Sequence, residues 1–145
     1  DSEEVLCLHF RATDYYGHLR EFFHKGIKLP KKYYINALEK INYKNFKKIY
    51  CLSDNLNEFE NLLKGIECFE KFHFVKDTSN IEDWLFIYKC KNIVQSNSSF
   101  CWTASLFNKK KSIQPLNGYN HFDNKRNSSI PYDFKLENSQ TVYSW

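Results

Sequence analysis

The sequence predicts an α/β fold in which a parallel sheet is covered by helices on both faces. The main observation is that short apolar runs with the character of buried strands alternate along the chain with segments of helical periodicity. The length of 145 residues favours one domain, and the contents of 42% hydrophobic and 18% aromatic residues exclude a disordered chain. No apolar run approaches the ~18 residues of a membrane-spanning helix.

Five segments are expected to be strands. The first two are continuous apolar runs, which is typical of strands that are buried on both faces of a sheet. The last one directly precedes Pro115. In chain order, the expected strands are Val5–Leu8, Ile49–Leu52, Phe72–Val75, Ile93–Val94 and Ser112–Gln114.

Four helices are expected between and after these strands. Pro30 suits the first position of the first helix, because that position needs no N–H, and apolar residues recur at helical spacing as far as Ile41. The residues Ser53–Asn55 are N-cap types before a second helix, which Gly65 ends. The segment Asp83–Lys89 predicts a largely buried helix, and residues 100–107 predict the fourth.

The charge and the cysteines limit the function classes. The net charge of +4, from 21 Lys and Arg against 17 Asp and Glu, suits a phosphate-bearing partner but does not by itself indicate nucleic acid. Basic clusters with Tyr and Phe between them, such as Lys109–Lys111, leave a nucleic-acid binder open as an alternative, although a solvated basic surface is favoured. Such a face is also compatible with peripheral docking to anionic lipids.

The five cysteines form no CxxC pair. We therefore expect buried free thiols rather than a disulfide framework or a zinc site, and a reducing compartment such as the cytoplasm. They are Cys7, Cys51, Cys68, Cys90 and Cys101.

Three polar clusters follow predicted strands directly. In parallel sheets, ligands bind beyond the carboxyl ends of the strands, so these clusters are expected to meet at one edge of the sheet. They are His9–Asp14, Ser53–Asn55 and Asn97–Ser99.

The residue types of these clusters suit a phosphate together with sugar-like polar groups. Asn97–Ser99 begins a predicted helix, where free N–H groups and the positive end of the helix dipole favour an anion, and ordinary N-capping is the alternative. Arg11 offers a two-pronged donor for phosphate, or pairs with Asp14 across the turn. For Asp14 three roles are open: the partner of Arg11, an acceptor for sugar hydroxyls, or a general base. For His9 the alternative to a role in binding is a half-buried histidine that is hydrogen-bonded to the backbone. The chain has neither GxGxxG nor GxxxxGK[ST], which excludes the usual dinucleotide and P-loop motifs. No DxD-type acidic pair occurs in a clear metal-binding context either, so we expect Arg11 and a helix terminus to neutralise the phosphate without a metal.

Several motifs then occur in the order of one known family. The segment 9–15, HFRATDY, resembles the HxRRxDY motif of the α-1,2-fucosyltransferases, glycosyltransferase family 11. Leu29-Pro30 with Tyr33-Tyr34 and Ala37 resembles the LPxxYYxxA segment, and residues 50–54, YCLSD, resemble the strand that ends in FSDD. Asp83, Cys90-Lys91 and the segment 97–102, NSSFCW, resemble D…CxHxIIxNSSFSWW, and Pro115 lies where the family has K-x-x-x-x-P.

The resemblance implies the second, Rossmann-like half of a GT-B-like enzyme that binds GDP-fucose. It implies an inverting, metal-independent transfer of L-fucose to a galactoside hydroxyl of a glycan, without a cofactor. Arg11 would hold the β-phosphate, His9 and Asp83 would read the guanosine, Ser98 and Ser99 would bond the phosphates, and Asp14 would order the motif or the fucose. The expected catalytic residues are Arg11 and Asp14, and the expected donor-binding residues are His9, Arg11, Ser53, Asp54, Asp83, Asn97, Ser98, Ser99 and Phe100. For the general base, Asp14 and His18 are candidates, as is a residue of another domain.

The sequence also departs from the family pattern. Ala12 replaces the second arginine of the motif, Asn55 replaces the second acid of FSDD, and Asn92 stands where the family often has His. We expect residues 1–145 to form one Rossmann-like GDP-sugar-binding domain, with 116–145 as an irregular extension and with a separate N-terminal half as a partner. A binding module without catalysis, or a degenerate transferase, is the alternative function. The expected location is the cytoplasm or the cytoplasmic face of a bacterial membrane, with the Golgi as the alternative.

Overall fold

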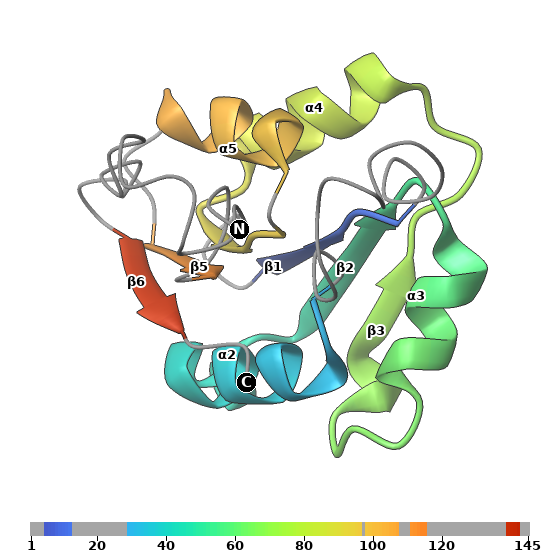
Figure 1. Cartoon of the computed structure of the whole chain (residues 1–145), viewed down its shortest axis with the longest axis vertical. Helices are drawn as coiled ribbons and strands as arrows, with labels where there is room; N and C mark the ends of the chain where they lie inside the picture. Colours follow the sequence, from blue (N-terminus) through green and yellow to red (C-terminus); the bar gives the residue numbers. More distant parts are fainter. Residues whose placement is uncertain (1–4, 13–28, 97, 108–110, 116–138, 143–145) are drawn as a thin grey trace, which may run out of the picture.

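The computed structural model describes residues 5–12, 29–96, 98–107, 111–115 and 139–142. These residues form strands, α-helices and two short 3₁₀ helices (Figure 1). In chain order the elements are β1 (Val5–Phe10), α2 (Lys31–Ile41), η3 (Tyr43–Asn45), β2 (Lys48–Ser53), α3 (Leu56–Leu63), η4 (Phe69–Lys71), β3 (Phe72–Phe74), α4 (Asn80–Lys89), β4 (Asn92–Val94), α5 (Ser99–Leu106), β5 (Lys111–Pro115) and β6 (Ser139–Val142).

The strands form one parallel sheet in the order β3-β2-β1-β4-β5-β6. This is the strand order of a doubly wound Rossmann-type sheet, and the order reverses between β1 and β4. The α/β class and the parallel sheet predicted from the sequence are therefore confirmed. β1 lies in the middle of the sheet, where it pairs with β2 from Val5↔Lys48 to Phe10↔Ser53 and with β4 from Leu6↔Asn92 to Leu8↔Val94.

Helices cover both faces of the sheet (Figure 1). Successive side chains of a strand point to opposite faces, so Leu6, Leu8 and Phe10 join the core on the side of α2 and α3, while Cys7 joins the core under α4 and α5. Because both faces are buried, β1 shows no alternation of apolar and polar residues.

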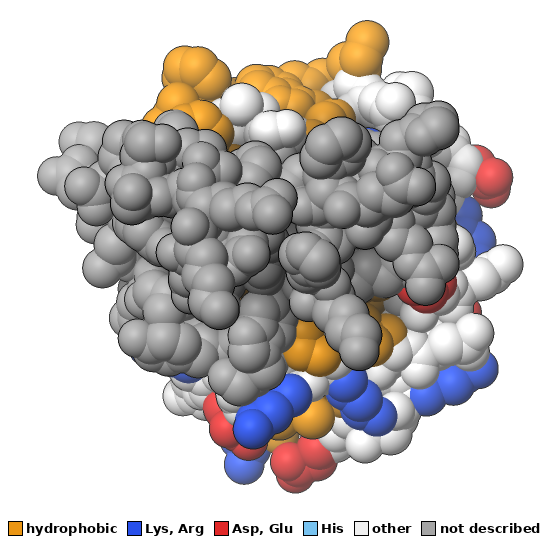
Figure 2. Space-filling view, viewed as in Figure 1, with side chains coloured by type: hydrophobic (Ala, Val, Ile, Leu, Met, Phe, Trp, Pro, Cys, Tyr) orange, Lys and Arg blue, Asp and Glu red, His pale blue; other side chains and the backbone are white. Residues whose placement is uncertain are grey.

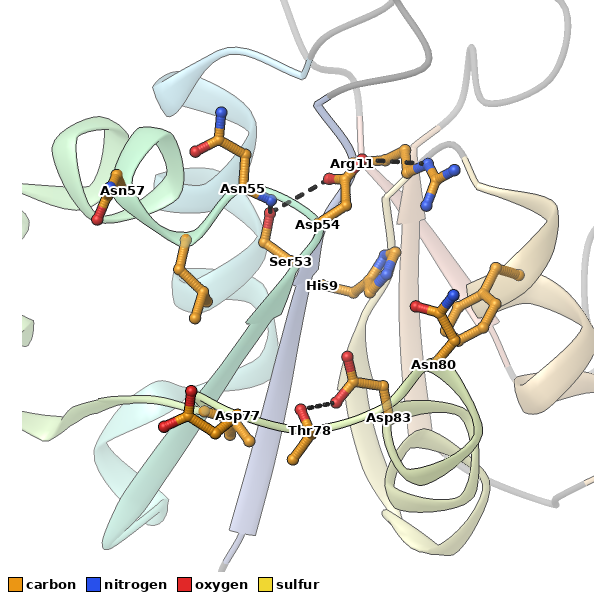
Figure 3. A pocket seen from close by; sticks show the side chains of 13 residues that line it. His9, Arg11, Ser53, Asp54, Asn55, Asn57, Asp77, Thr78, Asn80 and Asp83 are labelled. Atoms are coloured by element: carbon orange, nitrogen blue, oxygen red, sulfur yellow. Dashed lines mark hydrogen bonds and ion pairs between the residues drawn. The ribbon is translucent and has the colours of Figure 1, made fainter.

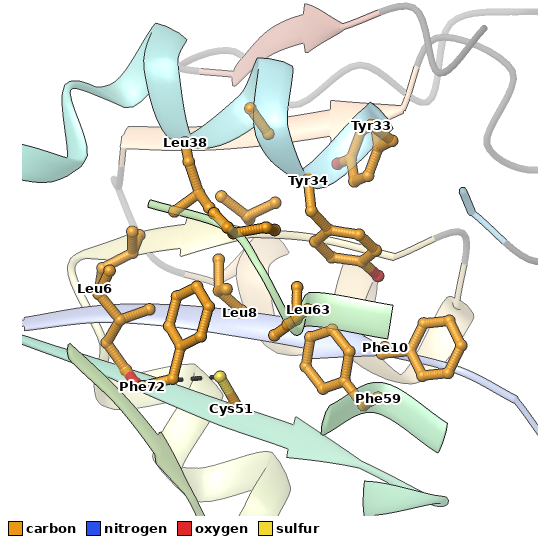
Figure 4. Close-up of a cluster of buried hydrophobic side chains, with 14 of the residues drawn as sticks. Leu6, Leu8, Phe10, Tyr33, Tyr34, Leu38, Cys51, Phe59, Leu63 and Phe72 are labelled. Carbon is orange, nitrogen blue, oxygen red and sulfur yellow. Dashed lines mark hydrogen bonds between the residues drawn. The ribbon is translucent and has the colours of Figure 1, made fainter. Parts of the chain in front are cut away.

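Aromatic side chains fill the core between the sheet and helices α2 and α3 (Figure 4). Phe59 of α3 is fully buried and stacks on Phe10 of β1, with ring centroids 5.0 Å apart. Tyr34 of α2 packs against Phe59 at 5.3 Å, and its hydroxyl donates to the carbonyl of His9. This cluster fixes the end of β1, and the polar residue Arg11 follows directly after it.

Local signals explain most of the helix ends. Asn55 caps α3 by accepting a hydrogen bond from the backbone N–H of Glu58, and Gly65 adopts a positive φ of 80° just past the helix. Pro30 precedes α2 as its N-cap, one position earlier than predicted, and Tyr33 N donates to its carbonyl. Helix α4 begins at Asn80 rather than near residue 83, because a capping box between Ser79 and Glu82 starts it there.

Two features differ from the sequence prediction. The helix expected over Asp83–Lys89 was predicted to be largely buried, yet Leu85 and Tyr88 are exposed. Ile81, in the first turn of α4 before that segment, is 74% exposed. The fully buried residue of α4 is Ile87, so only one side of the helix faces the core. The second difference is β6, a strand inside the expected irregular extension 116–145, which pairs with β5.

The five cysteines are free and buried, as the sequence indicated. Burial raises the pKa of Cys51 and of Cys7 well above that of an exposed thiol. In the described part of the chain, none of the helices combines the length and the apolar character that a membrane span requires.

Phe59→Ala is expected to lower the free energy of unfolding by about 3–5 kcal/mol, because it removes the ring that joins α3 to Phe10 and Tyr34 and leaves a cavity. Phe59→Leu, which keeps most of the volume, is expected to cost about 1 kcal/mol. Urea titrations followed by circular dichroism measure both. Equal stability of the alanine variant and the unchanged protein would show that this aromatic cluster does not hold the core.

Candidate functional site

A polar cavity of about 660 Å³ lies at the carboxyl ends of β1, β2 and β3 (Figure 3). Its size suits a nucleotide, since pockets for small molecules span roughly 300–1,000 Å³. Residues from distant parts of the chain line it: His9, Arg11, Ser53, Asp54, Asn55, Leu56, Asn57, Val75, Asp77, Thr78, Asn80, Asp83 and Phe100. The sequence-based expectation that polar clusters meet at one sheet edge is thus met for the segments after the first two strands.

Arg11 is held at this cavity by Asp54. The Arg11 Nε lies 3.4 Å from one oxygen of Asp54, and the other oxygen accepts a hydrogen bond from the backbone N–H of Ala12 at 2.8 Å. The ion pair follows from the sheet register, since Phe10 pairs with Ser53 and the chain leaves both strands side by side. The side chains of Arg11 and Asp54 are 28% and 17% exposed, so the guanidinium is oriented but still accessible to a ligand. Asp14, the sequence-based alternative partner of Arg11, lies outside the described residues.

Ser53 and Asn55 shape the turn between β2 and α3. The Ser53 hydroxyl accepts from the backbone N–H of Asn55 at 2.9 Å and donates to Asp54 at 3.4 Å. The side-chain oxygen of Asn55 accepts the N–H of Glu58 and caps α3. The replacement of the family's second acid by Asn55 therefore keeps a good N-cap at this position.

His9 is buried at the end of β1 in an uncharged form. Its Nδ1 lies 2.7 Å from the hydroxyl of Ser96, and its ring stacks on Phe100 at 6.0 Å. Burial lowers the pKa of His9 to about 4; the nearby Asp54 carboxylate opposes this shift and Arg11 adds to it. At neutral pH His9 is therefore a neutral hydrogen-bonding group and adds no positive charge to the cavity.

The segment between β3 and α4 supplies residues that sequence reasoning missed. Thr78 donates to the carboxylate of Asp83 at 2.6 Å, and Asp77 and Asn80 also line the cavity. Asp77 has a positive φ of 58°, a conformation that Asp tolerates better than most residues. Their signal in the sequence was their position directly after the predicted strand 72–75, the same signal that identified the other clusters.

The start of α5 only partly joins the cavity. Phe100 is among the lining residues, whereas Ser98 and Ser99 are not. Ser98 is the buried N-cap residue, and its carbonyl accepts the N–H of Trp102 at 2.9 Å; Ser99 is exposed. Of the residues expected from the sequence, His9, Arg11, Ser53, Asp54, Asp83 and Phe100 are thus brought together, while Asn97, Asp14 and His18 lie outside the described residues.

The lining side chains that the structure describes carry one cation, Arg11, and three carboxylates, Asp54, Asp77 and Asp83. Arg11 suits an anionic group, while the carboxylates suit N–H and O–H donors such as those of a base or a sugar. The cavity thus favours a ligand that combines one anionic part with several hydrogen-bond donors.

Burial of neutral His9 is expected to make the fold less stable in acid. Above pH 6.5 His9 is neutral in both the folded and the unfolded chain; as the pH falls from 6.5 to about 4, only the unfolded chain gains the proton. The free energy of unfolding is then expected to fall by up to roughly 3 kcal/mol over this window. Urea titrations at several pH values, compared with His9→Asn, isolate this contribution. Identical pH profiles for the two proteins would contradict it.

Comparison with known proteins gives the site its context. The sequence model of glycosyl transferase family 11 matches residues 1–139. A search of curated proteins gave no match. The family consists of glycosyltransferases, whose substrates are a nucleotide sugar and a glycan acceptor, and this agrees with a cavity for one anionic part and several hydrogen-bond donors at the ligand edge of the sheet. Because the match extends over strands β1 to β5, the helices between them and every segment that lines the cavity, this chain belongs to glycosyl transferase family 11.

Proposed function

We propose that this chain binds GDP-fucose and serves the transfer of L-fucose to a galactoside hydroxyl of a glycan. The observation that carries the proposal is Arg11, a guanidinium fixed by Asp54 at the edge of the sheet where ligands bind. A guanidinium matches two oxygens of a phosphate at once. Membership of glycosyl transferase family 11 supplies the reaction class.

In the proposed reaction, the acceptor hydroxyl attacks the anomeric carbon of fucose while the bond from that carbon to the diphosphate oxygen breaks. The hydroxyl proton passes to a general base, for which Asp14, His18 or a residue of another domain are the candidates. Negative charge then grows on the departing GDP. Arg11 stabilises this charge, and because Asp54 already orients it, little reorganisation is needed during the reaction. The family resemblance assigns Ser98 and Ser99, at the N-terminus of α5, to the same diphosphate. Of the described residues of this segment, only Phe100 lines the cavity, so the contribution of Ser98 and Ser99 requires the diphosphate to extend beyond the cavity toward α5.

The carboxylate of Asp83 is the group best suited to select guanine. Guanine carries two neighbouring N–H donors on one edge, which a carboxylate accepts together, whereas adenine and uracil do not present this pair. Thr78 donates to Asp83 and thereby holds its orientation. Neutral His9 lies in the same cavity and offers a further hydrogen bond without adding charge.

A second function, binding of a GDP-sugar without turnover, is favoured by Ala12. This residue is fully buried, packs in the core with Phe10 and donates its N–H to Asp54. An arginine side chain does not fit in that core position without a rearrangement of the chain. GDP-fucose turnover by the full-length protein, measured by GDP release with glycan acceptors, separates an enzyme from a binding module.

Arg11→Ala is expected to weaken GDP binding by roughly 10- to 100-fold, because hydrogen bonds to charged groups contribute about 1.5–3 kcal/mol. Isothermal titration calorimetry with GDP measures the effect. Arg11→Lys keeps the charge but loses the two-pronged geometry, so an intermediate affinity is expected.

Lys44→Ala is a matched control for the loss of one positive charge. Lys44 is an exposed residue of η3, which precedes β2 and so lies at the opposite end of that strand from the cavity. Its removal is expected to leave GDP affinity unchanged. Equal affinities of the Arg11→Ala variant and the unchanged protein would refute the assignment of Arg11.

Asp83→Asn is expected to reduce the preference for guanine. In thermal-shift titrations, GDP and GDP-fucose are expected to raise the melting temperature of the unchanged protein more than UDP-, CMP- or ADP-sugars do, because only ligands that bind the native state stabilise it. In the Asp83→Asn variant, the difference between GDP and ADP is expected to shrink. A variant with the original GDP preference would show that another group reads the base.

A further inference from the structure

The outer surface of α4 and α5 is unusually apolar. Figure 2 shows hydrophobic side chains gathered at the edge of the molecule that these two helices occupy in Figure 1. Ile81 and Phe107 are 74% and 68% exposed, and Leu85, Tyr88 and Leu106 are exposed as well. Helix α5 contains no charged residue among Ser99–Leu106. Large apolar side chains gathered on one exposed edge are typical of an interaction site.

The apolar residues of α4 follow the spacing of a helix-pairing seam. Ile81, Leu85 and Tyr88 are separated by four and then three residues, which places them on one side of the helix. The opposite side carries Ile87, which is buried in the core beneath the helix. The exposed seam has the d-a-d pattern by which two helices interdigitate.

Two opposite charges flank this seam on the same side. Glu82 and Lys89 are both exposed and lie seven residues apart, so they occupy equivalent positions of successive heptads. When two copies of such a helix pack antiparallel about a two-fold axis near Leu85, Glu82 of one copy lies beside Lys89 of the other, twice over. Glu82 remains charged near neutral pH, because its carboxylate accepts hydrogen bonds from the backbone N–H and the hydroxyl of Ser79, which lower its pKa.

We propose that a second copy of this chain covers this surface, and that the two α4 helices pack antiparallel through Ile81, Leu85 and Tyr88. The contact is self-complementary, as a two-fold homodimer requires. Leu106, the last residue of α5, and Phe107, its C-cap, widen the apolar area beside the seam. An anionic membrane fits the same surface less well, because the exposed charges of α4 have both signs rather than a basic excess. The dimer is independent of the nucleotide that the cavity binds.

The first test compares the mass in solution of the unchanged protein and Leu85→Lys. Sedimentation velocity over a concentration series is expected to give a two-chain particle for the unchanged protein. Leu85→Lys places like charges at the two-fold axis, which is expected to raise the dissociation constant by roughly 100-fold or more. As a control, Asn61→Lys adds the same charge at an exposed position of α3, which lies on the opposite face of the sheet. This variant is expected to leave the dimer intact.

The second test exchanges the flanking charges. Lys89→Glu alone and Glu82→Lys alone each bring like charges together across the two-fold axis, so each variant is expected to be largely monomeric. A mixture of the two variants pairs opposite charges again and is expected to form a heterodimer. Because the two variants have almost the same mass, one of them is labelled uniformly with ¹⁵N, and native mass spectrometry then detects the heterodimer by its intermediate mass. Glu82→Lys also removes the capping box of α4, so circular dichroism and the melting temperature of each variant are compared with those of the unchanged protein to show that the fold is kept.

Three results would overturn the proposal. The first is an unchanged protein that stays monomeric at every concentration, including one that instead sediments with phosphatidylglycerol vesicles. The second is a dimer that Leu85→Lys leaves intact. The third is a mixture of folded charge variants that does not associate. None of these measurements uses GDP, so failure of the dimer and failure of the nucleotide site are distinguishable.

Discussion

The carboxylate of Asp54 joins the two segments that leave β1 and β2, and the geometry of the cavity depends on it. One oxygen accepts the backbone N–H of buried Ala12, which fixes the path of the chain beyond β1. The other oxygen faces Arg11 and sets the direction of the guanidinium. The carboxylate of Asp54 thus accepts a buried backbone N–H and also orients the guanidinium of Arg11. From the sequence, Asp54 was expected to bind the nucleotide sugar, and in the structure it supports Arg11.

The sequence carried enough information to predict the class of fold and the edge of the sheet at which the cavity lies. The apolar runs around Leu6 and Ile49 predicted buried strands, and the polar residues after them predicted a shared edge. The partner of Arg11 was not predictable, because the register that brings Asp54 beside it arises from the pairing of distant strands. Strand β6 was missed because Ser139–Val142 has little apolar pattern and its pairing with β5 is a tertiary contact. The exposure of Leu85 and Tyr88 was missed because an apolar residue does not show from sequence which surface will cover it.

The described residues that line the cavity differ in charge. Arg11 is the cation among the described lining residues, Asp77 and Asp83 offer acceptors, and His9 is kept neutral by burial. With Ala12 buried in the core, the position that carries a second arginine in the family motif faces away from the ligand edge. The described lining of the cavity therefore offers more hydrogen-bond acceptors than positive charges.

The central position of β1 has a consequence for how the chain folds. β1 lies near the start of the sequence, yet Val5 pairs with Lys48 and Leu6 pairs with Asn92. The middle of the sheet cannot close until β2 and then β4 have been synthesised, and each closure orders a long intervening segment first. Until then the apolar residues of β1 lack one or both of their neighbouring strands, which leaves them open to aggregation on a ribosome-bound chain.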